Sequence, residues 1–244
     1  MSTRSLVQGQ RIIVIGGGSG IGLAAARRAA ELGAEVTIAG RSAERLEQAA
    51  ESLKGIVRKA VLDLRSEDDV RTFFAEAGEF DHLVITAGEM KHGLGKVAEI
   101  ETSNAREQFE SRFWGPYLAV RYGAALIREG GSITLTTGFF GDKAVPGAAV
   151  PSAVHGALEN LGRVLAVELA PVRVNVVSPG YTDTPMHDWM SKEQKQAWFE
   201  QTAPTLPVRS IASADDIAGA VLFLMENANT TGITLTVDGG ARLV

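Results

Sequence analysis

The stretch from Arg11 to Gly22, RIIVIGGGSGIG, predicts a buried strand that passes directly into a glycine-rich turn. Ile12–Ile15 is an apolar run without polar alternation, which is typical of a strand buried on both faces of a parallel sheet. The glycines that follow remove Cβ atoms where the backbone must bend tightly or approach a ligand closely. From Ile21 the pattern becomes helical and stops at Gly33, so the amides of the helix N-terminus point into the turn. We therefore expect a site for an anion such as the pyrophosphate of a dinucleotide, rather than a flexible surface turn.

Composition excludes several classes of protein. A chain of 244 residues, 45% of them hydrophobic, suits one α/β domain, and a net charge of -5 without a basic cluster argues against nucleic acid or an anionic membrane as partner. No apolar run reaches the length of a bilayer span, and residues 1–10 lack the hydrophobic core of a signal peptide. The absence of cysteine excludes disulfides and thiol catalysis, and the four histidines show no metal-ligand spacing. We expect a cytoplasmic protein without a metal that acts on a small molecule.

Strands alternate with helices along the whole chain, which predicts a single domain over residues 1–244. Its fold class is α/β, a Rossmann-type doubly wound parallel sheet of about seven strands with helices on both faces. The expected strands are 12–15, 34–39, 56–62, 81–86, 131–137, 172–178 and 233–237, and the expected helices are 21–33, 46–53, 66–76, 102–128, 152–170 and 213–226. The polar, aromatic-spotted segment 186–207 is predicted to be a mobile lid over the substrate pocket.

The residues after the second predicted strand indicate which dinucleotide binds. An acidic residue here usually holds the ribose 2′-hydroxyl of the unphosphorylated cofactor, whereas this chain has Arg41 and Ser42. A guanidinium and a hydroxyl bind a 2′-phosphate, which a carboxylate would repel. The alternative is that Arg41 is solvated and Ser42 simply caps the next helix. We favour the phosphate interpretation, and therefore NADP(H).

The glycine spacing, Gly16-x-x-x-Gly20-x-Gly22, resembles the T-G-x-x-x-G-x-G motif of the short-chain dehydrogenase/reductase family. The resemblance extends to I-T-A-G at residues 85–88, where the family has N-N-A-G, to Pro179-Gly180 with its following threonines, and to V-D-G-G at residues 237–240. The order and spacing of these motifs cover nearly the whole chain. The resemblance implies an NADP(H)-binding oxidoreductase that forms a homodimer or homotetramer through its two long helices and last strand.

The resemblance also implies a set of cofactor-binding residues. Asp63 ends the third predicted strand and matches the family's adenine-contacting Asp; its alternative role is to cap the helix 66–76. The complete set is Gly16, Gly18, Ser19, Ile21, Gly22, Arg41, Ser42, Asp63, Leu64, Ala87, Gly88, His155, Pro179, Gly180, Thr182 and Thr184.

The family's catalytic residues are missing from this chain. Family members use a Tyr and a Lys spaced Y-x-x-x-K, a Ser at the end of the fifth strand and an Asn in the preceding helix. The Tyr protonates the alkoxide that hydride transfer leaves, the Lys lowers the Tyr pKa, and the Ser holds the oxygen. Counting from Gly131 and from Pro179 gives one register, in which those places hold Pro151, His155, Gly138 and Arg112. No register supplies a Tyr.

Two candidate catalytic residues remain, His155 and Thr137. His155 is the nearby side chain whose usual pKa suits proton transfer near neutrality; alternatively it fills the Lys position and bonds a ribose hydroxyl. Thr137 either binds a carbonyl oxygen after a one-residue slip or is an ordinary strand threonine. The first functional hypothesis is hydride transfer to or from a small carbonyl or alcohol with a non-standard proton relay. The second is a catalytically inactive NADP(H)-binding protein, acting as a sensor or as a partner subunit.

Overall fold

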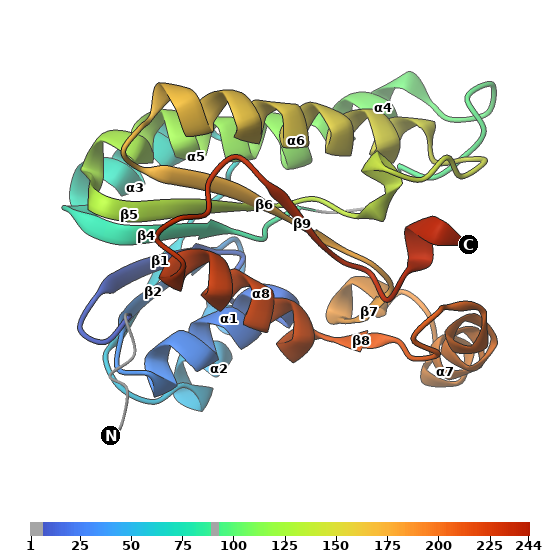
Figure 1. The fold of residues 1–244 in the computed structure, drawn as a ribbon, viewed down its shortest axis with the longest axis horizontal. Coiled ribbons are helices and arrows are strands. Elements are labelled where there is room, and N and C mark those ends of the chain that lie inside the picture. The colour runs from blue at the N-terminus through green and yellow to red at the C-terminus, as the bar shows by residue number, and fades with distance from the viewer. Residues whose placement is uncertain (1–6, 89–92) are drawn as a thin grey trace.

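The structure is a computed structural model that describes residues 7–88 and 93–244. A parallel sheet in the order β3-β2-β1-β4-β5-β6-β9 lies between two layers of helices (Figure 1). Its strands are β1 (Arg11–Ile15), β2 (Glu35–Gly40), β3 (Val57–Val61), β4 (Phe80–Ile85), β5 (Ile127–Thr136), β6 (Arg173–Pro179) and β9 (Thr234–Val237). The predicted single-domain α/β fold, with its parallel sheet of seven strands, is confirmed.

The helices cover both faces of the sheet, as Figure 1 shows. One layer holds α1 (Gly20–Glu31), α2 (Ala43–Ser52) and α8 (Ala214–Glu226); the other holds α3 (Glu67–Ala77), α4 (Thr102–Phe109), α5 (Gly115–Gly123) and α6 (Ala149–Glu168). A further helix, α7 (Lys192–Thr202), lies outside these layers, near the two-residue strands β7 (Thr182–Asp183) and β8 (Ala212–Ser213). None of the helices in the described part of the chain has the length and apolar character needed to cross a bilayer.

The first strand explains why the sheet is buried on both faces. Ile12 and Val14 belong to the core under α1, α2 and α8, whereas Ile13 and Ile15 belong to the core under α3, α5 and α6. Because side chains alternate across a strand, an unbroken apolar run is what a sheet covered on both faces requires. The run therefore fixes β1 in the middle of the sheet and places the glycine turn at its carboxyl edge.

The predicted continuous helix over residues 102–128 is wrong. The chain forms α4, then a π-helical turn over Glu110–Trp114, then α5, and β5 already begins at Ile127. Pro116 has no N–H to donate to the carbonyl four residues earlier, which accounts for the widened turn. Gly115 lets this turn lie close to the neighbouring loop, since a Cβ there would be 2.9 Å from Leu64 Cβ. As a result Arg112 points inward and is only 8% exposed.

Candidate active site

The glycine turn after β1 is too tight for side chains. Gly16 has a φ of +92°, and a Cβ at Gly22 would lie 2.3 Å from the carbonyl oxygen of Gly16. Thr86, the second residue of the I-T-A-G motif, places its Oγ1 2.5 Å from the positions of both missing Cβ atoms. Ser19 begins α1 without capping it through its own side chain, so the amides of the first turn face the hollow that the glycines leave. This cradle fits the pyrophosphate of a dinucleotide.

The predicted segment from Pro179 to Thr184 lies beside this cradle. A Cβ at Gly20 would be 3.4 Å from Thr184 Cβ, so the threonine borders the turn directly. Gly180 is required because a Cβ there would be 2.5 Å from the Cα of Asp238, where the chain crosses after β9. Thr182 Oγ1 donates to the Gly180 carbonyl at 3.0 Å and holds the segment in its turn. The structure thus brings together two motifs that are more than 150 residues apart in the sequence.

Arg41 and Asp63 follow the neighbouring strands β2 and β3. Arg41 is exposed, and Ser42 caps α2 by accepting from the Arg45 amide at 3.2 Å. Asp63 accepts a hydrogen bond from Arg65 Nη2 at 2.6 Å; that bond lowers the pKa of Asp63, and the charge of Arg41 lowers it further. The alternative of Asp63 as the cap of α3 is wrong, because Ser66 takes that place. Arg41 and Asp63 thus lie at the carboxyl ends of neighbouring strands, close enough for the charge of Arg41 to act on Asp63.

Leu64, Ala87 and Gly88, which were predicted as cofactor-binding residues, follow strands β3 and β4 at their carboxyl ends. Leu64 is buried against the π-helical turn, and Ala87 packs on the core under α5 and α6. The Gly88 carbonyl accepts from Arg112 Nη2 at 3.4 Å. The predicted residue Ile21 lies in the first turn of α1 and packs, partly buried, against the core shared by α1, α2 and α8, and Gly18 faces α2.

His155 is buried against residues from two other segments, the π-helical turn and the loop after β5. Its Nε2 is 3.3 Å from Arg112 Nη1, and its ring stacks on Phe140 with centroids 6.1 Å apart. A Cβ at Gly138 would be 2.9 Å from His155 Cε1, so the imidazole occupies space that only glycine leaves open. Burial and the Arg112 charge lower the pKa of His155 to about 4, against the opposing effect of the Gly138 backbone. The ring is therefore neutral at pH 7, and its pKa lies well below the value near neutrality that was expected from the sequence.

Thr137 is directed into the interior of the protein. Its Oγ1 donates to Glu159 Oε1 at 3.2 Å, and both residues are buried. Burial raises the pKa of Glu159, and the charge of Asp142 raises it further. Thr137 follows the last residue of β5, so it is not a strand residue as the alternative supposed. Since its one hydroxyl proton is already donated to Glu159, the geometry favours a structural role over that of a ligand for a carbonyl oxygen.

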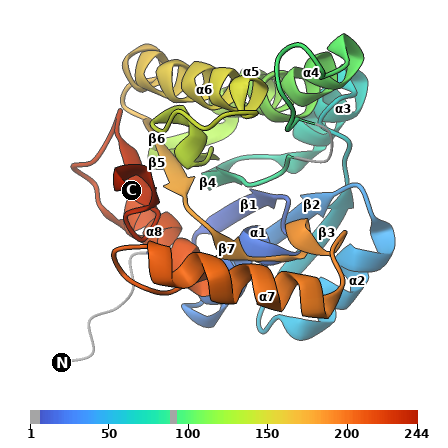
Figure 2. The same cartoon turned by 90° about the vertical axis from the view of Figure 1, so that its right-hand side faces the viewer.

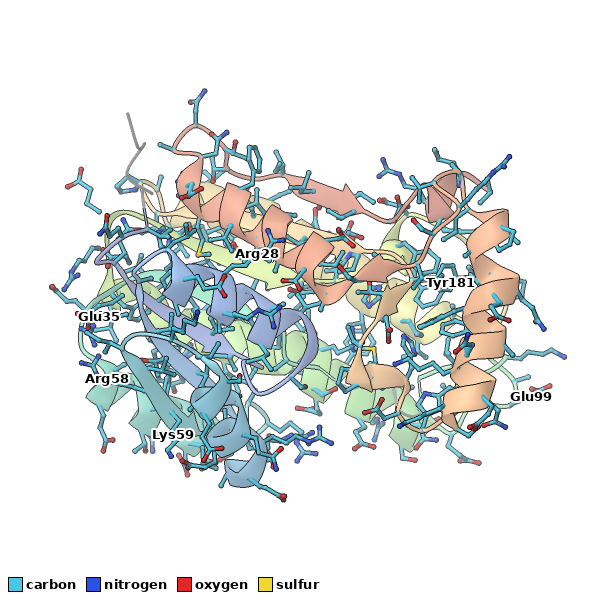
Figure 3. The ribbon with its side chains drawn as sticks, turned by 90° about the horizontal axis from the view of Figure 1, so that it is seen from below. Arg28, Glu35, Arg58, Lys59, Glu99 and Tyr181 are labelled. Atoms are coloured by element: carbon cyan, nitrogen blue, oxygen red, sulfur yellow. The ribbon has the colours of Figure 1, made fainter. Side chains whose placement is uncertain are left out.

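Segment 186–207 covers the carboxyl edge of the sheet with α7, as Figure 2 shows. Tyr181 points toward this helix (Figure 3), and its ring contacts Trp198 with centroids 5.7 Å apart. His187 contacts Trp198 as well, at 5.0 Å. Lys195 ties α7 to β7 through an ion pair of 2.5 Å with Asp183. Tyr181 is thus part of the aromatic support of α7.

Arg112 is not among the predicted site residues, although it stands at the place of the family's Asn. Two signals were present: a charged residue among aromatic ones in ESRFWG, and the Gly-Pro pair that follows it. Met186 was missed as well; its Sδ lies 3.9 Å from Arg112 Nη2, at the start of the proposed lid.

The sheet order and the glycine cradle at its carboxyl edge define a dinucleotide-binding domain of Rossmann type. A family model described as enoyl-(acyl carrier protein) reductase matches residues 16–242. A short-chain dehydrogenase/reductase of Stachybotrys chlorohalonatus, ATR9, is 33% identical over 252 residues, 97% of this chain and 98% of the relative. A 3-oxoacyl-[acyl-carrier-protein] reductase of Rattus norvegicus is 33% identical over 94% of this chain and 97% of its own.

A solved structure described as a small-chain dehydrogenase in complex with NADPH has a TM-score of 0.83 and 37% identity. The similarity covers 97% of this chain and all of that one. The chain belongs to the short-chain dehydrogenase/reductase family of oxidoreductases.

Proposed function

We propose that this chain is an NADP(H)-dependent oxidoreductase that transfers hydride to or from a small carbonyl compound or alcohol. The observation that carries the proposal is the glycine cradle with Thr184 beside it and the Arg112–His155 pair at the same edge of the sheet. The NADPH complex of the similar dehydrogenase and the carbonyl chemistry named for the rat relative support it. A homodimer or homotetramer stays part of the proposal.

The proposed cofactor contacts are those that the family resemblance implies, and the glycine cradle supports the first of them. The α1 amides hold the pyrophosphate, Asp63 and Leu64 border the adenine, and Ala87 and Gly88 flank the ribose. Pro179–Thr184 holds the remaining end of the dinucleotide, and segment 186–207 closes over it and excludes water. When bound, the reduced cofactor supplies the hydride. The chain contributes position and polar contacts, with a relay that contains no tyrosine at the family position.

Arg41 is expected to select the phosphorylated cofactor. Replacing it in Arg41→Ala should weaken NADPH about 10- to 100-fold and leave NADH unchanged, because a hydrogen bond to a charged group contributes about 1.5–3 kcal/mol. Calorimetric titration of both nucleotides measures the effect. Arg58→Ala is the control, since Arg58 is another exposed arginine, on β3, that pairs with Glu35 at 3.6 Å. Equal affinities for NADPH and NADH in the unaltered protein would contradict the proposal.

The second candidate is an inactive NADP(H)-binding protein, a sensor or a partner subunit. The observation that favours it is the neutral, buried His155, which is a poor acid at pH 7, together with Pro151 at the place of the family's Tyr. NADPH consumption with a panel of aldehydes, ketones and quinones separates the two candidates. We expect slow but measurable turnover with the more reactive acceptors, because hydride transfer itself depends on proximity. NADPH binding without consumption for any acceptor would support the inactive protein instead.

A further inference from the structure

We propose that His155 donates a hydrogen bond from Nδ1 to the oxygen of the hydride acceptor, in a tautomer selected by Arg112. The inference deepens the proposed function and rests on it. It gives His155 a different role from the proton donor expected from its usual pKa, and it makes Arg112 a positioning residue.

The tautomer follows from the contact between the two side chains. A guanidinium has only N–H donors, and Arg112 remains protonated at pH 7 although burial lowers its pKa to about 10. His155 Nε2, 3.3 Å from Arg112 Nη1, must therefore accept the hydrogen bond. A neutral imidazole whose Nε2 accepts carries its proton on Nδ1. Arg112 thus fixes which nitrogen is the donor.

The Nδ1 atom lies beside the backbone of Gly138, which raises the pKa of His155 slightly but forms no hydrogen bond of ordinary geometry with this nitrogen. His155 is 2% exposed, and its Nδ1 has no hydrogen-bond partner of ordinary geometry among residues 7–88 and 93–244. Buried donors are rarely left without a partner, so this one indicates a missing ligand. A Cβ at Gly138 would lie 3.4 Å from Nδ1. The donor therefore faces the position from which the family's Ser hydroxyl holds the substrate oxygen.

Access to this donor passes under the start of the proposed lid. Met186 Sδ contacts Arg112 Nη2 at 3.9 Å, and Phe140 covers one face of the imidazole. Segment 186–207 is fixed by the ion pair of Lys195 with Asp183 and by the contact of His187 with Trp198. Movement of this segment would admit the acceptor. Because Arg112 and His155 are both buried, a hydrogen bond from His155 to a developing anion is stronger than it would be in water.

The donor determines the class of acceptor. The N–H of a neutral imidazole is a weaker acid than an enol or a hydroquinone, so it stabilises the anion of either through a hydrogen bond without transferring its proton, and water then protonates the product. An α,β-unsaturated ketone or a quinone meets this condition, because its charge is delocalised; a simple ketone gives a localised alkoxide. For an enone, hydride from bound NADPH forms the C–H bond at the β-carbon. The C=C electron pair moves into the enolate, NADP⁺ is left, and a proton from water then adds to the α-carbon.

The tautomer is tested by nitrogen NMR of the imidazole in protein labelled on histidine with ¹⁵N, without cofactor. At pH 7 His155 should show a protonated Nδ1 and an unprotonated Nε2, and Arg112→Met should produce a mixture of tautomers. A purely structural arginine would leave the nitrogen shifts unchanged. A protonated Nε2 or an imidazolium in the unaltered protein overturns the inference, whether or not the variant folds.

Activity provides the second test, with 2-cyclohexenone and cyclohexanone as matched acceptors. NADPH should be consumed with the enone and at least about 100-fold more slowly with the ketone. His155→Asn keeps an amide donor near Nδ1 and should retain turnover within tenfold, whereas His155→Gln moves the donor toward Nε2 and should lower kcat about 10²-fold. Equal rates for the two acceptors, or an unaffected His155→Gln, overturn the inference and leave the proposed function standing. No consumption with any acceptor while NADPH binds overturns the proposed function.

Discussion

A Gly22→Ala variant is expected to lose at least about 3 kcal/mol of unfolding free energy, and its NADPH affinity with it. The added Cβ would lie 2.3 Å from the Gly16 carbonyl oxygen and 2.5 Å from Thr86 Oγ1. The first of these is a backbone atom in a turn held by hydrogen bonds from Gly16 and Gly17 to the Ala39 carbonyl, at 2.8 and 3.3 Å. The turn cannot give way without distorting the end of β1. Thermal unfolding should show a Tm lower by about 6–12 °C, given about 2–4 °C per kcal/mol for a chain of this size.

Gly18→Ala is the matched control in the same turn. A Cβ at Gly18 would find its nearest atoms, in Arg45 and Leu46, at 3.6 Å, which is ordinary contact distance. Without cofactor its Tm should stay within about 2 °C of the unaltered protein, since substitutions without new clashes change stability by about 0.5 kcal/mol. If Gly18→Ala and Gly22→Ala melted at the same temperature, the account of the turn would be wrong.

The difference between these two glycines marks a limit of sequence analysis. The motif showed that the turn needs glycines, because a strand, several glycines and a helix follow one another locally. It did not show that Thr86, which follows β4, lies too close to Gly22 for a side chain there, whereas Gly18 has space around it. Local patterns therefore predicted the fold and the glycine turn after β1, and contacts between distant segments decide what each residue does there.

His155 illustrates the same limit in its chemistry. Its place on α6 was predicted from spacing, but its pKa depends on burial and on Arg112, 43 residues earlier in the chain. Arg112 in turn reaches His155 because the helix widens before Pro116, an effect that apolar periodicity does not reveal. Likewise Thr137 is committed to Glu159 on another element. A site assembled from several segments is visible in sequence only where each segment carries its own motif.

Acid should destabilise the protein well above the range in which carboxylates usually titrate. Burial, followed by the charge of Arg173, lowers the pKa of His82 to about 4, and burial with Arg112 does the same for His155. In the unfolded chain the two imidazoles are protonated near pH 6.5, the ordinary histidine pKa, whereas in the folded chain they stay unprotonated down to about pH 4. The contribution of the two histidines to the free energy of unfolding is therefore complete above pH 6.5 and is lost as the pH falls toward 4. Each histidine contributes about 3 kcal/mol over this window.

His82 is the cleaner of the two for measurement, because it is remote from the proposed chemistry and hydrogen bonds Ser132 Oγ and Gln10 Oε1, each at 2.8 Å. Urea unfolding between pH 7 and pH 4.5 should give a slope of free energy against pH of about two protons from His82 and His155. His187, whose pKa is lowered by burial and by the charge of Lys195, adds to this slope, and Glu159, whose pKa is raised, acts in the opposite direction. His82→Phe should be less stable at pH 7, since Ser132 and Gln10 lose their partner, yet its slope should be smaller by about one proton. A stability that is flat from pH 7 to pH 4.5, or a slope unchanged in His82→Phe, would show that the folded chain accepts these protons and that the buried imidazoles are not held neutral by their surroundings.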